Sequence, residues 1–124
     1  MKVVVCITGW RRPEYFKQVI DGILSNDNHK QFEYIVSIDH GGKFVEHEQV
    51  LHDAKLGCEL IKHKSRQGCA GNVGYTFMRA FDHTKADAVI MLEDDTVPGP
   101  DMFDYMVKML EPVSYTHLTL PTIV

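Results

Sequence analysis

An apolar segment that runs straight into three carboxylates constrains the fold of this chain more than any other feature. Residues 88–92 read AVIML, and Glu93, Asp94 and Asp95 follow at once. The prolines that come shortly afterwards cannot continue a central strand, because proline has no N–H group for the ladder. The pattern predicts a buried strand that starts near Asp87 and ends at the acids.

The position of the acids indicates a site for a divalent cation. In open α/β sheets, ligands bind at the carboxyl edge of the strands. Adjacent carboxylates repel one another, and a bound cation relieves that repulsion. Oxygen ligands suit Mg²⁺ or Mn²⁺, which usually also take oxygens from a substrate phosphate. The alternative is a solvated acidic turn without a ligand.

Strand patterns and helix patterns alternate four times along the chain. Predicted strands cover residues 2–8, 32–39, 58–61 and 87–93, and predicted helices cover residues 13–25, 44–55, 69–81 and 101–110. This alternation demands parallel strands joined by crossover helices. The predicted fold class is therefore α/β, a Rossmann-like parallel sheet of about four strands with helices on both faces. We expect the first and fourth strands, which have the longest apolar runs, at its centre.

Composition and charge exclude several classes of protein. The 13 basic and 17 acidic residues give a net charge of −4, which argues against a nucleic-acid partner. Neither a membrane span nor a signal-peptide pattern is expected from the apolar runs. Cys6, Cys58 and Cys69 are too widely spaced for a zinc knuckle or a disulfide framework. We interpret them as free thiols and predict a cytoplasmic location.

Polar or small residues follow each predicted strand and so converge on one edge of the sheet. The candidates that could bind a substrate are Thr8, Arg11, Arg12, Asp39, Arg66, Gly68, Gly71, Asn72, Glu93 and Asp94, with Asp95 as the metal ligand. Carboxylates can accept hydrogen bonds from a ribose or a base, glycines and a helix start suit an anion, and arginine suits a diphosphate. Together these residues predict a site for a nucleotide diphosphate and a metal. Taken singly, Asp39 is also typical of a strand-end turn and the glycines of helix boundaries.

Other motifs give weaker signals. The segment GCAGNVG lacks the GK[ST] ending of a P-loop and does not follow the first strand, as a dinucleotide fingerprint would. The histidines are scattered through polar segments, and we predict that they are solvated, with His40 alone near the site. Trp10 is predicted to pack or to line a base pocket.

Four segments carry a family resemblance. They read VVVCITGWRRPEYFKQVIDGIL, YIVSIDHGG, RQGCAGNVGYTFMRAF and ADAVIMLEDDTVPGPDMFDYM. Their order resembles the nucleotide-sugar-binding half of GT-A glycosyltransferases. It is most similar to the branch with the N-acetylglucosaminyltransferase that initiates complex N-glycans, and to bacterial inverting transferases. The resemblance covers roughly the first 112 residues, and the acidic motif is its most specific part.

The resemblance implies a donor, a metal and a reaction. The donor would be a nucleotide-diphosphate sugar, foremost a UDP-sugar, and the sugar would pass with inversion to a glycan or another hydroxyl acceptor. Asp95 would bind Mn²⁺ or Mg²⁺ directly, with Asp94 and Glu93 in support. Asp39 would bind the nucleoside, and Arg11 or Arg12 would contact the donor. The catalytic base and the acceptor site of the family lie in a carboxyl-terminal half, so we expect this chain alone to be inactive.

The last residues differ from the rest of the chain. Residues 113–124 read VSYTHLTLPTIV and contain no Asp, Glu, Lys or Arg. They resemble the in-frame translation of a sequencing adaptor. We therefore interpret residues 1–112 as the nucleotide-sugar-binding part of a GT-A domain and residues 113–124 as a non-native tail. A genuine irregular tail or a short added strand is the alternative.

Two other functions fit parts of the pattern. A nucleotidyltransferase shares the fold and the metal carboxylates, but it usually has a glycine-rich loop after the first strand, where this chain has GWRRPE. A signalling receiver also gathers aspartates at strand ends, but its acidic pair follows the first strand. Either a nucleotidyltransferase-like enzyme or a non-catalytic, receiver-type module is thus the alternative to a glycosyltransferase.

Overall fold

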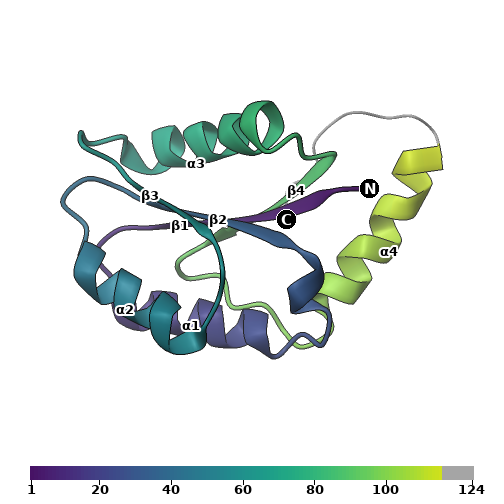
Figure 1. The fold of residues 1–124 in the computed structure, drawn as a ribbon, viewed down its shortest axis with the longest axis horizontal. Helices are drawn as coiled ribbons and strands as arrows, with labels where there is room; N and C mark the ends of the chain where they lie inside the picture. Colours follow the sequence, from purple (N-terminus) through teal and green to yellow (C-terminus); the bar gives the residue numbers. More distant parts are fainter. Residues whose placement is uncertain (116–124) are drawn as a thin grey trace.

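The computed structural model describes the backbone of residues 1–115 and the side chains of residues 1–110. Its four strands are β1 (Val3–Gly9), β2 (Glu33–Ile38), β3 (Glu59–Lys62) and β4 (Ala88–Glu93). All pair in parallel, in the order β3-β2-β1-β4. The predicted α/β class is confirmed, with one parallel sheet and helices on both of its faces (Figure 1).

One helix follows each strand. The helices are α1 (Pro13–Leu24), α2 (Phe44–Ala54), α3 (Gly68–Met78) and α4 (Met102–Tyr115). A 3-10 turn at His29–Gln31 precedes β2, and a π-helical turn at Arg79–His83 extends α3. Figure 1 shows α3 on one side of the sheet and α1 and α2 on the other, with α4 at the amino end of the strands.

The hydrophobic core lies in two layers, one on each face of the sheet. Successive side chains of a strand point to opposite faces, so β1 contributes to both layers. Val5 and Ile7 pack with Phe16 of α1 and Phe103 of α4. On the other face, Cys6 packs beneath α3 and the π-helical turn. Every residue of β1 is buried, which explains its continuous apolar run.

The strand order corrects one expectation. We predicted β1 and β4 at the centre of the sheet, whereas β2 and β1 are central and β4 lies at the edge of the described sheet. Residues 88–92 of β4 are nonetheless all buried, because helices cover both faces of the strand. The length of an apolar run reports burial of the two faces and not the number of neighbouring strands.

Helix α2 corrects a further expectation. Val45, an apolar residue of its first turn, is 76% exposed. His47 was predicted to be solvated, but it is fully buried and lies 4.8 Å from Phe16 between ring centroids. Leu51, one turn further along, is also buried, so the inner face of α2 runs through His47 and Leu51. Val45 lies two residues before His47 and therefore points elsewhere.

Helix α4 ends later than predicted. We expected its end at Leu110, but it continues to Tyr115 through the position of Pro112. A proline removes one helical hydrogen bond without necessarily ending the helix. The first three residues of the segment interpreted as a tail are thus helical, and residues 116–124 lie outside the described residues. The non-native origin of residues 113–124 stays a prediction.

Strand register brings the predicted site loops together. Thr8 of β1 lies beside Glu93 of β4, and Gly9 lies beside Ile38 of β2. The N–H of Asp39 donates to Gly9 O at 3.0 Å, which extends the pairing by one step. The loop after β1 therefore lies between the end of β2 and the acidic turn after β4.

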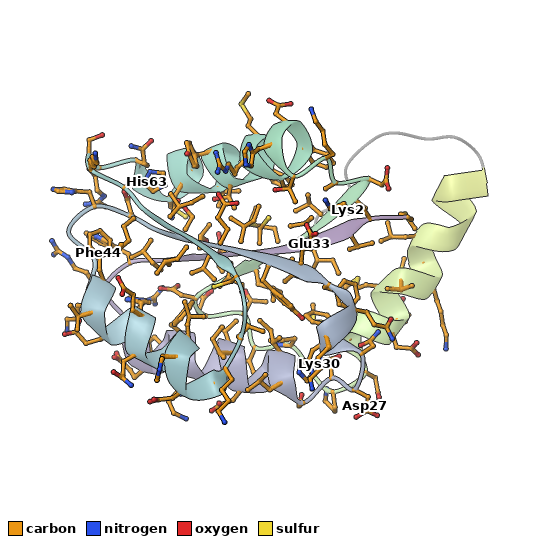
Figure 2. The ribbon with its side chains drawn as sticks, in the orientation of Figure 1. Lys2, Asp27, Lys30, Glu33, Phe44 and His63 are labelled. Carbon is orange, nitrogen blue, oxygen red and sulfur yellow. The ribbon has the colours of Figure 1, made fainter. Side chains whose placement is uncertain are left out.

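The opposite edge of the sheet is held by a different set of contacts. Lys2 pairs with Glu33 at 3.2 Å, and the backbone N–H of Lys2 donates to the carboxylate of Asp87 at 2.6 Å. Figure 2 shows Lys2 and Glu33 at the far end of the sheet from Phe44 and His63, which lie at the carboxyl edge. This edge keeps the starts of the strands in register and leaves the carboxyl edge free for the site.

Candidate functional site

A cavity of about 470 Å³ opens at the carboxyl edge of the sheet. Its lining residues are Thr8, Gly9, Trp10, Arg11, Arg12, Asp39, Arg66, Gly68, Cys69, Asn72, Glu93 and Asp94. Nine of the eleven residues predicted from the sequence are among them. The two predicted residues that do not line it are Gly71 and Asp95.

Asp39 lies at the centre of a hydrogen-bond network and is only 4% exposed. Its Oδ1 accepts the N–H groups of His40 and Gln67, each at 2.8 Å. Its Oδ2 accepts the N–H of Gly68 at 2.9 Å and the Nε–H of Arg66 at 3.1 Å. Burial alone would raise the pKa of Asp39, but the three backbone N–H groups and the charge of Arg66 lower the pKa below its ordinary value. Asp39 is therefore ionised at neutral pH, with four donors around its oxygens.

The start of α3 is already occupied by an anion. We predicted that its N–H groups would be free for a ligand, but those of Gln67 and Gly68 bind the carboxylate of Asp39. Gly68 has a φ of +76°, a conformation that glycine adopts without steric cost and that turns the chain into the helix. Gly71 lies one turn further along, outside the cavity lining. The helix start therefore positions Asp39.

Trp10 forms one wall of the cavity, with two arginines against its indole. Its Nε1–H donates to His40 O at 3.0 Å, which fixes the ring. The guanidinium carbon of Arg66 lies 3.8 Å from the ring centroid, and that of Arg11 lies 4.3 Å away. Arg11 also donates from Nε to Gly41 O at 3.2 Å. Cation–π contacts thus hold both side chains beside the cavity.

Arg12 joins the loop after β1 to the acidic turn. Its Nη2 donates to Asp94 Oδ1 at 2.8 Å, and this hydrogen bond and the charge of Asp94 raise the pKa of Arg12. The side chain of Asp94 is 10% exposed and that of Arg12 is 48% exposed. Asp94 therefore neutralises an arginine of the cavity and is less available to a cation than its neighbours.

Glu93 and Asp95 are the exposed members of the acidic motif. Glu93 lines the cavity, and its Oε1 lies 3.8 Å from Cys69 Sγ. The negative charge of Glu93 raises the pKa of Cys69, which keeps the thiol protonated at neutral pH. The N–H of Thr96 donates to Glu93 O at 3.0 Å and closes a turn over Asp94 and Asp95.

The carboxylate oxygens of the acidic motif are suitable ligands for a hard divalent cation. Carboxylate oxygens are the ligands that Mg²⁺ and Mn²⁺ prefer. Among the described residues, no group of three or more His, Cys, Asp or Glu is arranged to hold a metal ion. Mg²⁺ commonly takes only one or two carboxylates and completes its shell with water and phosphate oxygens. Glu93 and Asp95 could hold such a cation together with a phosphate-bearing ligand.

A buried polar cluster of Ser37, His63 and Asn72 adjoins the cavity, and of these three only Asn72 was predicted as a site residue. Ser37 Oγ–H donates to Asn72 Oδ1 at 2.6 Å, and His63 Nε2 lies 2.8 Å from Ser37 Oγ. The Nδ2–H of Asn72 donates to Ser37 O at 3.0 Å, so α3 is tied to β2. His63, predicted to be solvated, is 8% exposed. Ser37 is the one polar residue inside the apolar run YIVSI, and that irregularity was the available signal.

Comparison with known families identifies the class of protein. Residues 4–116 match the family model of glycosyl transferase family 2. The chain belongs to this family. Membership confirms the resemblance to GT-A glycosyltransferases and the transferase class. No curated protein sequence matches the chain.

Solved structures of S. aureus TarS share the fold of this family 2 domain. TarS 1–349 has a TM-score of 0.70 and 14% identity, over 90% of this chain and 33% of that one. TarS 1–349 in complex with UDP has a TM-score of 0.70 and 12% identity, over 90% and 32%. TarS itself has a TM-score of 0.71 and 13% identity, over 90% and 20%. The chain therefore spans a third or less of the length of these proteins. Among the residues that the structure describes, no helix is long and apolar enough to cross a membrane.

Proposed function

We propose that this family 2 domain binds a nucleotide-diphosphate sugar, foremost a UDP-sugar, together with Mn²⁺ or Mg²⁺. The observation that carries the proposal is one cavity that combines an aromatic wall at Trp10 with exposed carboxylate at Glu93. Because β1 lies between β2 and β4, the loop after β1 joins these two parts. In a nucleotide diphosphate the nucleoside is joined covalently to the diphosphate, so one such ligand can span both parts of the cavity. The complex of the similar protein TarS with UDP supports this class of ligand.

The nucleoside belongs against Trp10 and Asp39. The indole offers a flat surface on which a base can stack, and its orientation is fixed by the hydrogen bond to His40 O. Asp39 lines the same cavity, and its Oδ2 can accept a hydrogen bond from a ribose or a base once Arg66 is displaced from it. Arg11 and Arg66 supply positive charge at the same end.

The diphosphate and its cation belong at the acidic turn. Glu93 would hold the cation from the cavity lining, and Asp95, which follows the lining residue Asp94 in the chain, is the proposed direct ligand. The bound cation would neutralise the diphosphate that departs when the sugar is transferred. Arg12 is held by Asp94 through one N–H of Nη2, and its other N–H groups can donate to a phosphate oxygen at the edge of the cavity.

The complete enzyme would transfer the sugar to a hydroxyl group of a glycan or another acceptor. The family resemblance implies inversion at the anomeric carbon and a general base that removes the acceptor proton. We assign neither that base nor the acceptor site to any described residue. Glycosyl transfer is favoured over nucleotidyl transfer because the family match covers residues 4–116.

Titration calorimetry with UDP tests the proposal. We expect UDP to bind more tightly with Mn²⁺ than after chelation by EDTA, because the cation links the acidic turn to the diphosphate. Uridine, which has no phosphate, serves as the control and should bind with the same affinity in both buffers. Equal affinity for UDP with and without Mn²⁺ would exclude the metal role. Absence of UDP binding in both buffers would exclude the donor class.

A further inference from the structure

Arg66 occupies the part of the cavity in which the proposed nucleoside would bind. Its guanidinium lies over the indole of Trp10 at 3.8 Å and donates from Nε to Asp39 Oδ2 at 3.1 Å. A base stacked on that indole and a hydroxyl bound to Asp39 would need the same two partners. One side chain of the protein therefore takes both positions.

The partners of Arg66 are held independently of it. Trp10 is fixed by its hydrogen bond to His40 O. Asp39 keeps three backbone N–H donors, from His40, Gln67 and Gly68, if Arg66 leaves. The turn before α3 therefore does not depend on the guanidinium. Removing Arg66 should take one of the two guanidinium groups off the indole and open one acceptor position on Oδ2 of Asp39, which keeps its hydrogen bond from Gly68, without unfolding the site.

Arg66 itself is held loosely. Its side chain is 55% exposed, and the carboxylate and the indole are its two contacts in the cavity. The carboxylate of Asp39 is buried, but it keeps three backbone N–H donors without Arg66, so a ligand can compete with the half-exposed guanidinium for Asp39 and for the indole. Arg11 differs because its Nε donates to a backbone carbonyl, Gly41 O, and not to a carboxylate.

We infer that Arg66 is a specificity-determining residue that favours phosphate-bearing ligands over bare nucleosides. The inference rests on the proposed function. A nucleoside must displace the guanidinium and gives it no new partner. A nucleotide diphosphate displaces it too, but its phosphates offer the released guanidinium a charge-assisted, bidentate contact. Displacement of Arg66 therefore weakens the binding of uridine. When UDP binds, the new contact between Arg66 and the phosphates compensates for the contacts that Arg66 loses.

The fluorescence of Trp10 tests this inference, because the chain contains one tryptophan. In Arg66→Ala we expect uridine to bind about five-fold more tightly, because the ligand no longer has to displace one cation–π contact and one ion pair whose guanidinium is half exposed. UDP with Mn²⁺ should bind about five-fold more weakly, from the loss of one charged contact to phosphate. Arg66→Lys keeps the charge without the planar fork and should retain more UDP affinity than Arg66→Ala.

A second readout needs no ligand. Acrylamide should quench Trp10 more strongly in Arg66→Ala than in the wild type, because the guanidinium no longer covers the indole. Lys64→Ala is the matched control, since Lys64 is an exposed cation of the same turn. It should change neither the quenching nor the ratio of the two affinities.

The outcomes separate the two proposals. Tighter uridine binding, weaker UDP binding and stronger quenching in Arg66→Ala alone support the role of Arg66. Unchanged or weaker uridine binding in Arg66→Ala, with UDP still bound by the wild type, overturns that role and leaves the donor proposal intact. Equal effects in Lys64→Ala overturn it in favour of general charge. Failure of the wild type to bind UDP removes both proposals.

Discussion

Arg12 donates from Nη2 to Asp94 Oδ1 at 2.8 Å, and this ion pair joins two loops that lie 82 residues apart in the chain. One loop follows β1 and carries Trp10, and the other is the acidic turn after β4. Because the carboxylate of Asp94 is nearly buried, it depends on Arg12 for neutralisation. The two loops should therefore move and unfold as one unit.

Replacement of Arg12 tests this coupling. Arg12→Ala leaves the carboxylate of Asp94 buried without its cation, so the Tm should fall. The double variant Arg12→Ala/Asp94→Asn removes the stranded charge and should recover part of the loss. As a control, Lys17→Ala breaks an exposed ion pair with Asp21 within α1 and should leave the Tm almost unchanged. A Tm equal to that of the wild type in Arg12→Ala would show that the pair does not couple the loops.

Asp95→Asn separates a metal site from a solvated acidic turn. If Asp95 binds the cation, the substitution should abolish the Mn²⁺-dependent part of UDP binding. Stability without metal should stay within about 0.5 kcal/mol or rise, because one charge leaves a repelling cluster. Asp27→Asn, an exposed acid at the other end of the molecule, is the control (Figure 2). Unaltered Mn²⁺-dependent binding would assign the acids to a turn without a ligand.

Asp39 should stabilise the fold and bind the nucleoside. Asp39→Ala leaves the N–H groups of Gln67 and Gly68 without their acceptor, at a cost of roughly 2 kcal/mol. Denaturant midpoints would measure that loss, with the exposed Asp53→Asn as control. The variant should also weaken uridine binding in EDTA, where no metal contributes. Wild-type affinity for uridine would exclude Asp39 from the nucleoside site.

The pKa of Asp39 sets a pH dependence of stability. The folded pKa is lowered below its ordinary value, so the unfolded state binds the proton more readily. The stabilisation by Asp39 is fully present above about pH 4 and is lost as the pH falls through the folded pKa. Between pH 5 and pH 2, the wild type should therefore lose more stability than Asp39→Asn. Parallel curves for the two proteins would contradict this origin.

His47 should produce a second pH dependence, at higher pH. Its Nδ1 lies 2.7 Å from Lys43 O, and its Nε2 is buried without a partner among the described residues. Burial lowers the pKa of His47, so stability present above about pH 6.5 is lost as the pH falls towards the folded pKa. His47→Leu has no imidazole to protonate, so its free energy of unfolding should rise relative to that of the wild type as the pH falls from 7.5 to 5.5. His52→Leu, an exposed histidine of α2, should follow the wild type, and the same behaviour in both variants would refute the prediction.

The strands, the helices and the edge at which the site lies follow from the order of the amino acids alone. Residues 3–7 of β1 and 88–92 of β4 are apolar because helices cover both faces of these strands, and such a run can be read directly from the sequence. Residues directly after such strands must meet at one edge, because parallel strands end together. Thr8, Asp39 and Glu93 could therefore be placed near one another before their distances were known.

The partners of these residues, in contrast, follow from the packing of segments that are distant in the chain. The sequence does not encode strand order directly, so the edge position of β4 and the pair between Arg12 and Asp94 emerged from packing. Likewise, a polar residue such as His47 is buried when its helix face points inward, whatever its own polarity. Asp39 accepts hydrogen bonds from Arg66, Gln67 and Gly68, which lie 27 to 29 residues further along the chain. Hydrophobic periodicity cannot reveal such contacts.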